Sequence, residues 1–134
     1  MVYGVAGVAS EVVFTGARDG LRRRSSALEG HSYLWMLPIY GLSAFLFEPA
    51  HAVLRGRTWW QRAAAYSLGI MTVELVTGTA LRRAIGVVPW DYSGRTRFAL
   101  PGGATRLDYA PLWGLAGLAL ERLHDGMRSV VVER

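Results

Sequence analysis

The chain has 134 residues, which suits a single domain, and 51% of them are hydrophobic against 19% charged. All 15 basic residues are arginine, and the formal net charge is +5. The arginines border apolar runs instead of forming one polar face, which argues against nucleic-acid binding. The absence of cysteine excludes disulfides and thiolate metal sites.

Four apolar runs, each flanked by arginine, follow one another along the chain. They predict helices over residues 2–17, 32–54, 60–82 and 108–124, with a loop over 83–107. Glu11 is the only charge in the first run, and Glu74 is the only charge between Ala63 and Leu81. A helix that crosses a bilayer needs about 20 apolar residues, so the second and third runs are long enough and the others lie near the lower limit.

The runs are long and rich in Ala, Leu and Gly, which favours helices over strands. Their faces are apolar nearly all round, and a chain of 134 residues is too small to bury four such helices in a core of its own. We therefore predict an all-α fold, an integral membrane bundle of about four short transmembrane helices. It forms a single polytopic domain over residues 1–134, with a structured loop between the third and fourth helices. The alternative is ordinary packing in a soluble helical core.

Aromatic residues gather at the ends of the runs, where membrane proteins place amphipathic rings at the interface with water. They are Tyr33, Trp35, Trp59, Trp60, Trp90, Tyr92, Tyr109 and Trp113. Small residues within the runs predict close helix packing, at Gly4, Gly7, Gly69, Gly114 and Gly117. The connections over 18–30 and 82–107 hold nine arginines, and the rest of the chain holds six. The positive-inside rule therefore predicts that these connections are cytoplasmic and that both termini lie outside.

Several short motifs occur in a fixed order along nearly the whole chain. They are Glu11–Thr15, Pro38–Gly41, Glu74 with Thr77–Gly78, Pro89–Ser93, and Leu107–Tyr109 with Trp113–Gly114. In this order they resemble the transmembrane protein 229 family and the related bacterial proteins labelled putative ABC-transporter type IV permeases. The resemblance implies a small polytopic membrane protein of about four helices and says little about activity. The chain has no glycine-rich phosphate loop, so it is not the ATPase of a transporter.

Two glutamates lie inside apolar runs, and we predict that they handle protons or cations. Glu11 is about ten residues into the first run and Glu74 about eleven into the third, so both are expected near the middle of the membrane. If the two helices are neighbours, the carboxylates approach each other and one is protonated, because like charges cannot both ionise in a low dielectric. The alternative is that each only hydrogen-bonds a neighbouring helix, through groups such as Tyr40 or Thr77.

Further candidates lie nearer the membrane surface. Glu48 and His51 are one helical turn apart, with Pro49 expected to kink or restart the helix between them. Asp91 precedes Tyr92 and is expected to bind a cation or headgroup amine, to act as a general base at the interface, or only to cap a helix or its own turn. The full set of binding or proton-handling candidates is Glu11, Glu74, Tyr40, Asp91, Tyr92, Glu48 and His51.

We expect no metal and no cofactor, because the histidines at 31, 51 and 124 lack metal-ligand spacing with a carboxylate on a single helix, apart from the pair Glu48 and His51. No serine lies in a nucleophile motif, no catalytic residue can be named, and we do not expect an enzyme. The first predicted function is conduction or exchange of a small ion or solute. The alternatives are a lipid-headgroup-binding membrane enzyme or module and a non-catalytic accessory membrane subunit. Expected partners are the lipid bilayer and further copies or other membrane subunits, without nucleic acid, in the bacterial inner (plasma) membrane.

Overall fold

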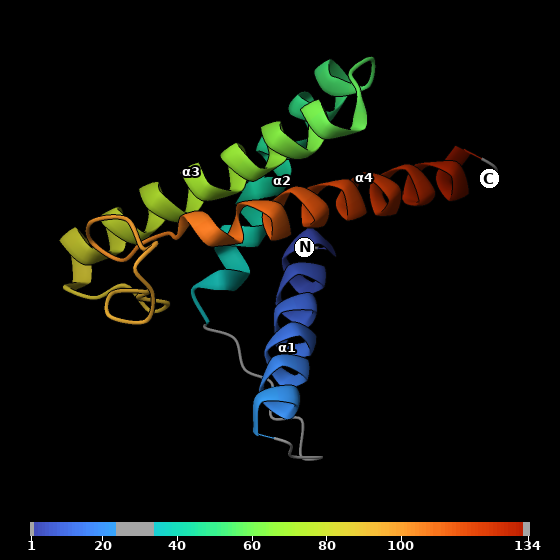
Figure 1. Ribbon diagram of the computed structural model, residues 1–134. Helices are drawn as coiled ribbons and strands as arrows, with labels where there is room; N and C mark the ends of the chain where they lie inside the picture. Colours follow the sequence, from blue (N-terminus) through green and yellow to red (C-terminus); the bar gives the residue numbers. More distant parts are fainter. Residues whose placement is uncertain (1, 24–33, 133–134) are drawn as a thin grey trace. The chain divides into compact units, whose positions relative to one another are not determined.

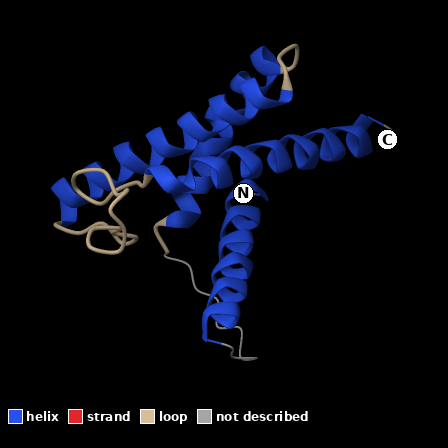
Figure 2. Ribbon diagram, in the orientation of Figure 1, coloured by secondary structure: helices blue, strands red, loops and turns tan. Residues whose placement is uncertain are grey.

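The structure is a computed structural model that describes residues 2–23 and 34–132. Within these ranges the protein consists of helices and loops with no strand, apart from an isolated bridge between Ala99 and Arg106 (Figures 1 and 2). The four α-helices are α1 (Val2–Arg23), α2 (Met36–Leu54), α3 (Trp59–Ile85) and α4 (Ala110–Val132), and a single 3₁₀ turn, η1 (Leu107–Tyr109), precedes α4. The all-α prediction is confirmed for this part of the chain.

The helices extend beyond the apolar runs from which they were predicted. α1 continues to Arg23 and α4 to Val132, where the sequence indicated ends near residues 17 and 124. Hydropathy marks where a segment stops being apolar, but arginine and glutamate are good helix formers and let the backbone hydrogen bonds continue. α2 is one helix through Pro49, so the helix does not restart there, and the expected kink stays a prediction.

α3 has a defined signal at each end. The Gln61 side chain accepts a hydrogen bond of 3.2 Å from the backbone N–H of Thr58, the residue before the helix. At the other end Gly86 adopts φ 79° and its N–H donates to the carbonyl of Arg82, which is a left-handed glycine cap. The glycine cap ends α3 at the start of the polar connection, which we define as residues 86–106.

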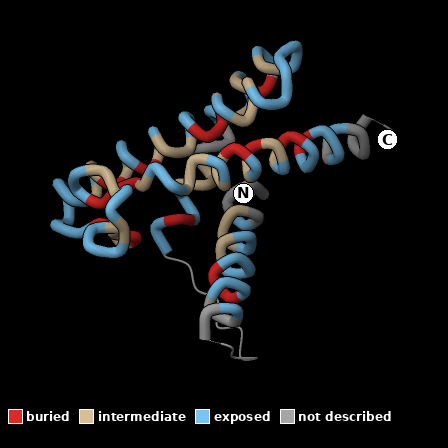
Figure 3. The backbone as a smooth tube through the Cα atoms, viewed as in Figure 1, coloured by how far each residue is buried: buried red, intermediate tan, exposed pale blue. Residues whose placement is uncertain are grey.

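Two helices of the described chain, α2 and α3, are long and apolar enough to cross a membrane. Many of their large apolar side chains are exposed, as Phe45, Leu68 and Val76 illustrate, and exposed surface covers much of both helices (Figure 3). An apolar side chain that points outward from a helix is better matched to lipid than to water. These observations support a membrane protein.

The chain forms two compact units, Met1–Pro49 and Ala50–Arg134. In the second unit α3 and α4 pack antiparallel, and the Ser67 hydroxyl donates a hydrogen bond of 2.8 Å to the carbonyl of Ala110. α4 therefore begins beside Ser67, in the N-terminal half of α3 (Figure 1). Gly117 allows the close approach, since a Cβ atom there would overlap the side chain of Tyr66, whereas Gly69 faces open space.

Candidate functional site

Glu74 lies in the C-terminal half of α3 and is buried, with 6% of its surface exposed. Its Oε2 atom accepts a hydrogen bond of 2.6 Å from the hydroxyl of Thr105, and its Oε1 atom lies 3.5 Å from the hydroxyl of Tyr92. Both partners belong to the polar connection between α3 and α4. The structure thus places two loop hydroxyl groups on a carboxylate within a candidate membrane span.

The connection reaches Glu74 because it folds back along α3. Trp90, which is 3% exposed, donates from its indole Nε1 to the carbonyl of Ala104 over 2.9 Å. A Cβ atom at Gly78 would lie 2.7 Å from the Cβ of Ala104, so the missing side chain at this position lets the loop lie against the helix. Thr105 follows directly and is 1% exposed. The local packing therefore fixes the Thr105 hydroxyl at Glu74.

Asp91 is engaged by its own loop and by α3. Its Oδ1 atom accepts a hydrogen bond of 2.7 Å from the backbone N–H of Ser93, and its Oδ2 atom lies 3.2 Å from Nη2 of Arg82. The Ser93 backbone hydrogen bond, followed by the Ser93 side chain and the Arg82 charge, holds the pKa of Asp91 below its ordinary value. These contacts are those of a turn cap. Binding of a cation or headgroup by Asp91 stays a prediction.

Arg106 forms an aromatic and ionic cluster next to Tyr92. Its guanidinium carbon lies 4.0 Å from the ring centroid of Tyr109 and 5.5 Å from that of Tyr92. Its Nε donates to the carboxylate of Asp108 over 2.8 Å. Cation–π contacts of this kind are stabilising, so the cluster helps to fix the ring whose hydroxyl reaches Glu74.

In the first unit, the hydroxyl of Tyr40 on α2 lies 3.3 Å from Oε2 of Glu11 on α1 and donates to it. Gly7 lies against the Tyr40 ring, since a Cβ atom there would be 2.6 Å from it. The sequence had named Tyr40 as a partner for such a glutamate. Glu11 and Glu74 belong to different compact units, so the predicted approach of the two carboxylates stays a prediction.

The second unit holds another buried polar group around His51. The His51 Nδ1 atom lies 3.3 Å from the hydroxyl of Tyr66 and 3.4 Å from Oε1 of Glu121, and its Nε2 atom lies 3.0 Å from Oδ1 of Asp125. The Tyr66 hydroxyl donates to Glu121 over 2.6 Å. These partners of His51 come from α3 and α4, whereas Glu48, its predicted partner, is exposed.

A family model with the description "Putative ABC-transporter type IV" matches residues 1–133. The chain belongs to this family. The match supports the second of the two resemblances found in the sequence, and the likeness to the transmembrane protein 229 family stays a prediction. No solved structure matches the chain.

Family membership, together with the apolar helices α2 and α3, supports a membrane protein related to transport. The sequence predicted Glu74 and Tyr92 as site residues but not Thr105, because a threonine in a polar loop has no sequence pattern that marks it as functional. It also missed Glu121 and Asp125, which looked like ordinary polar residues at the end of the fourth run. Thr77, a suggested partner for the Glu74 carboxylate, donates instead to the backbone carbonyls of Val73 and Glu74 in its own helix.

Proposed function

We propose that this protein moves a small ion or solute across the bacterial inner membrane, with Glu74 as its protonatable group. The observation that carries the proposal is the burial of Glu74 within a candidate span, with its two oxygens facing loop hydroxyls. Glu74 lies about 12 Å along α3 from Arg82, by the helical rise per residue. A charged group in mid-membrane costs at least about 2.5–3.5 kcal/mol, and such groups are usually functional.

The hydrogen-bond partners of Glu74 suit a group that gains and loses a proton. A hydroxyl can both donate and accept, so Thr105 and Tyr92 can donate to the carboxylate and can also accept from the carboxylic acid. A fixed N–H donor in their place could not accept a hydrogen bond from the O–H of the carboxylic acid. The site therefore offers hydrogen bonds in both protonation states.

The loop that brings these hydroxyls is non-helical backbone. At membrane depth such backbone is tolerated only where protein buries it or where it lines a water-filled cavity. A chain of 134 residues is small for a complete pathway. We therefore propose four membrane crossings per chain and a path completed by further copies or by other membrane subunits.

The proposal predicts that Glu74→Gln abolishes proton flux. The purified protein is placed in liposomes that contain a pH-sensitive dye. A potassium gradient with valinomycin, which makes the membrane permeable to potassium, sets a membrane potential that drives protons. The pH of the lumen is expected to change faster than in liposomes without protein. Glu74→Gln should fall to the level of empty liposomes, and Thr105→Val should lie in between, because it removes one of the two hydroxyl groups.

Two matched controls separate an effect specific to the Glu74 site from the general effect of the same type of substitution. Glu133→Gln makes the same change near the end of the sequence, and Thr72→Val removes a hydroxyl that bonds the carbonyl of Leu68 in its own helix. Both are expected to keep the wild-type flux. Full flux in a Glu74→Gln protein that is monodisperse on gel filtration rejects the role of Glu74. Absence of wild-type flux for protons, sodium and potassium rejects ion conduction.

A further inference from the structure

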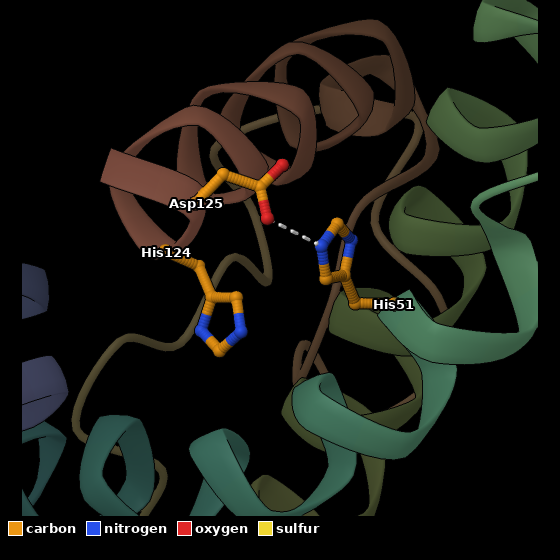
Figure 4. A group of neighbouring side chains, drawn as sticks. All are labelled: His51, His124 and Asp125. Atoms are coloured by element: carbon orange, nitrogen blue, oxygen red, sulfur yellow. Dashed lines mark hydrogen bonds and ion pairs between the residues drawn. The ribbon is translucent and has the colours of Figure 1, made fainter. Parts of the chain in front are cut away.

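Three potential metal ligands converge where the C-terminal end of α2 meets α4. His51 comes from α2, and His124 and Asp125 are successive residues of α4 (Figure 4). One ligand atom of each lies within 4.8 Å of the other two. Both histidines are buried, with 3% and 5% of their surfaces exposed, and their ring centroids are 5.2 Å apart. Two buried imidazoles beside a carboxylate are a donor set that proteins use for divalent transition metals.

We propose that His51, His124 and Asp125 bind a divalent transition-metal ion, for which Zn²⁺ is the probe. Two ligand atoms on a tetrahedral zinc ion, at about 2.0–2.1 Å each, lie about 3.3 Å apart. His51 Nε2 and Asp125 Oδ1 are already 3.0 Å apart. Closing a separation of up to 4.8 Å to this value takes a side-chain shift of about 1.5 Å. Three protein ligands leave a fourth position for water or another ligand.

The groups behind His51 are those that a metal-bound histidine needs. When Nε2 binds a metal, Nδ1 carries the proton and requires an acceptor, such as a carboxylate, a backbone carbonyl or water. The buried Glu121 carboxylate lies 3.4 Å from Nδ1 and also accepts a hydrogen bond from Tyr66. This arrangement fixes the ring so that Nε2 faces Asp125.

Arg55 competes with a metal for the same two ligands. Its Nη2 lies 2.7 Å from Oδ1 of Asp125, and its Nε lies 3.4 Å from Nε2 of His51. The Arg55 side chain is 59% exposed, so it can swing toward solvent when an ion binds. Removing this cation should therefore strengthen metal binding. A purely structural polar network predicts no such gain, which makes the direction of the Arg55 effect diagnostic.

The test is Zn²⁺ titration of the full chain, purified in detergent without a polyhistidine tag and stripped by a chelator, against a fluorescent zinc indicator. We expect one Zn²⁺ per chain. His124→Ala should weaken binding by more than about tenfold and Glu121→Gln by about tenfold, as losses of a ligand and of a ligand's partner do. Arg55→Gln should tighten binding. His31→Ala, which removes the third histidine of the sequence, is the matched control and should bind as the wild type does.

A Co²⁺ complex adds a readout that folding alone does not supply. A visible absorption band typical of four-coordinate Co²⁺ is expected in the wild type and in His31→Ala, and it should be lost in His51→Ala. Equal Zn²⁺ affinity of the wild type, His51→Ala and His124→Ala overturns the proposal. So does an Arg55→Gln protein that binds Zn²⁺ no more tightly than the wild type. The proposal is independent of ion flux through Glu74, which neither result would alter.

Discussion

Asp91 shows how one side chain can stabilise the loop that serves Glu74. Its carboxylate joins the backbone of Ser93 to the end of α3 at Arg82, so it fastens the start of the connection to the helix. Its side chain is 41% exposed, as is that of Arg82, and an exposed ion pair contributes little free energy because solvent screens it. Most of the effect of Asp91 should therefore come from the Ser93 hydrogen bond.

The lowered pKa of Asp91 predicts a specific pH dependence of stability. Its contribution is fully present above the ordinary aspartate pKa of about 3.9 and is lost as the pH falls through the lower folded-state value. Asp91→Asn should be less stable than the wild type at pH 7, by less than about 1 kcal/mol. The difference should shrink when thermal unfolding in detergent is followed below pH 4. A difference that grows on acidification contradicts this account.

At the scale of single residues, the sequence identified the glutamates Glu11 and Glu74 better than the side chains that hydrogen-bond to them. Glu74 stood out because a lone charge in an apolar run is conspicuous, and Tyr40 was named as a partner type before the structure paired it with Glu11. Thr105 lies 31 residues from Glu74, and no local pattern links a loop hydroxyl to a helix so far away. The sequence did not predict the grouping of His124 and Asp125 with His51. Residue spacing along one helix carries no information about ligands that come from two helices.

At the scale of elements, the contact between α3 and α4 rests on small residues. Gly114 lies against Ala63 and Gly117 against Tyr66, as expected for helices that approach closely in a membrane. Gly69, on the same helix as Tyr66, has nothing within 4 Å of the position of a Cβ atom. The sequence could not distinguish these glycines, because which helix face meets a neighbour depends on the register of the two helices.

This contrast predicts opposite effects of the same substitution. Gly117→Ala should destabilise the protein by about 1–3 kcal/mol, because the new methyl group overlaps Tyr66 and forces the helices apart. Gly69→Ala should be neutral or stabilise by up to about 1 kcal/mol, since alanine favours the helix and meets no neighbour. Chemical denaturation in detergent measures both. Equal destabilisation by the two variants contradicts the packing described for α4.

Element ends were less accessible from the sequence than element identity. The glycine cap at Gly86 ended α3 close to the predicted loop start. α1 and α4 have polar residues after their apolar runs that remain helical, so their ends lie beyond the hydropathy boundary. Helical hydrogen bonding and membrane affinity are different properties, and a charged residue changes only the second.

At the scale of the whole molecule, the distribution of arginine predicts a membrane orientation that labelling can test. The native chain has no cysteine, so single cysteines introduced at Arg57 and Arg97 are unique labelling sites. A membrane-impermeant maleimide added to intact cells should label Arg57→Cys and spare Arg97→Cys, because the connection over 82–107 is expected in the cytoplasm. Labelling of both from the same side contradicts α3 as a membrane crossing.

The start of α4 beside Ser67 has a consequence for how membrane crossings are counted. If α3 crosses completely, the chain returns through the membrane first as the segment that holds Thr105 and only then as the helix that begins at Ala110. Loop and helix together then make one return passage, and the C-terminus emerges on the side where α3 entered. A reporter fused to the C-terminus reports on which side of the membrane the chain ends, and this side is the same for this path as for a fourth helix that crosses the whole membrane. Only a probe of depth, such as a lipid-borne quencher acting on Trp90 in a variant without the other four tryptophans, distinguishes the two paths.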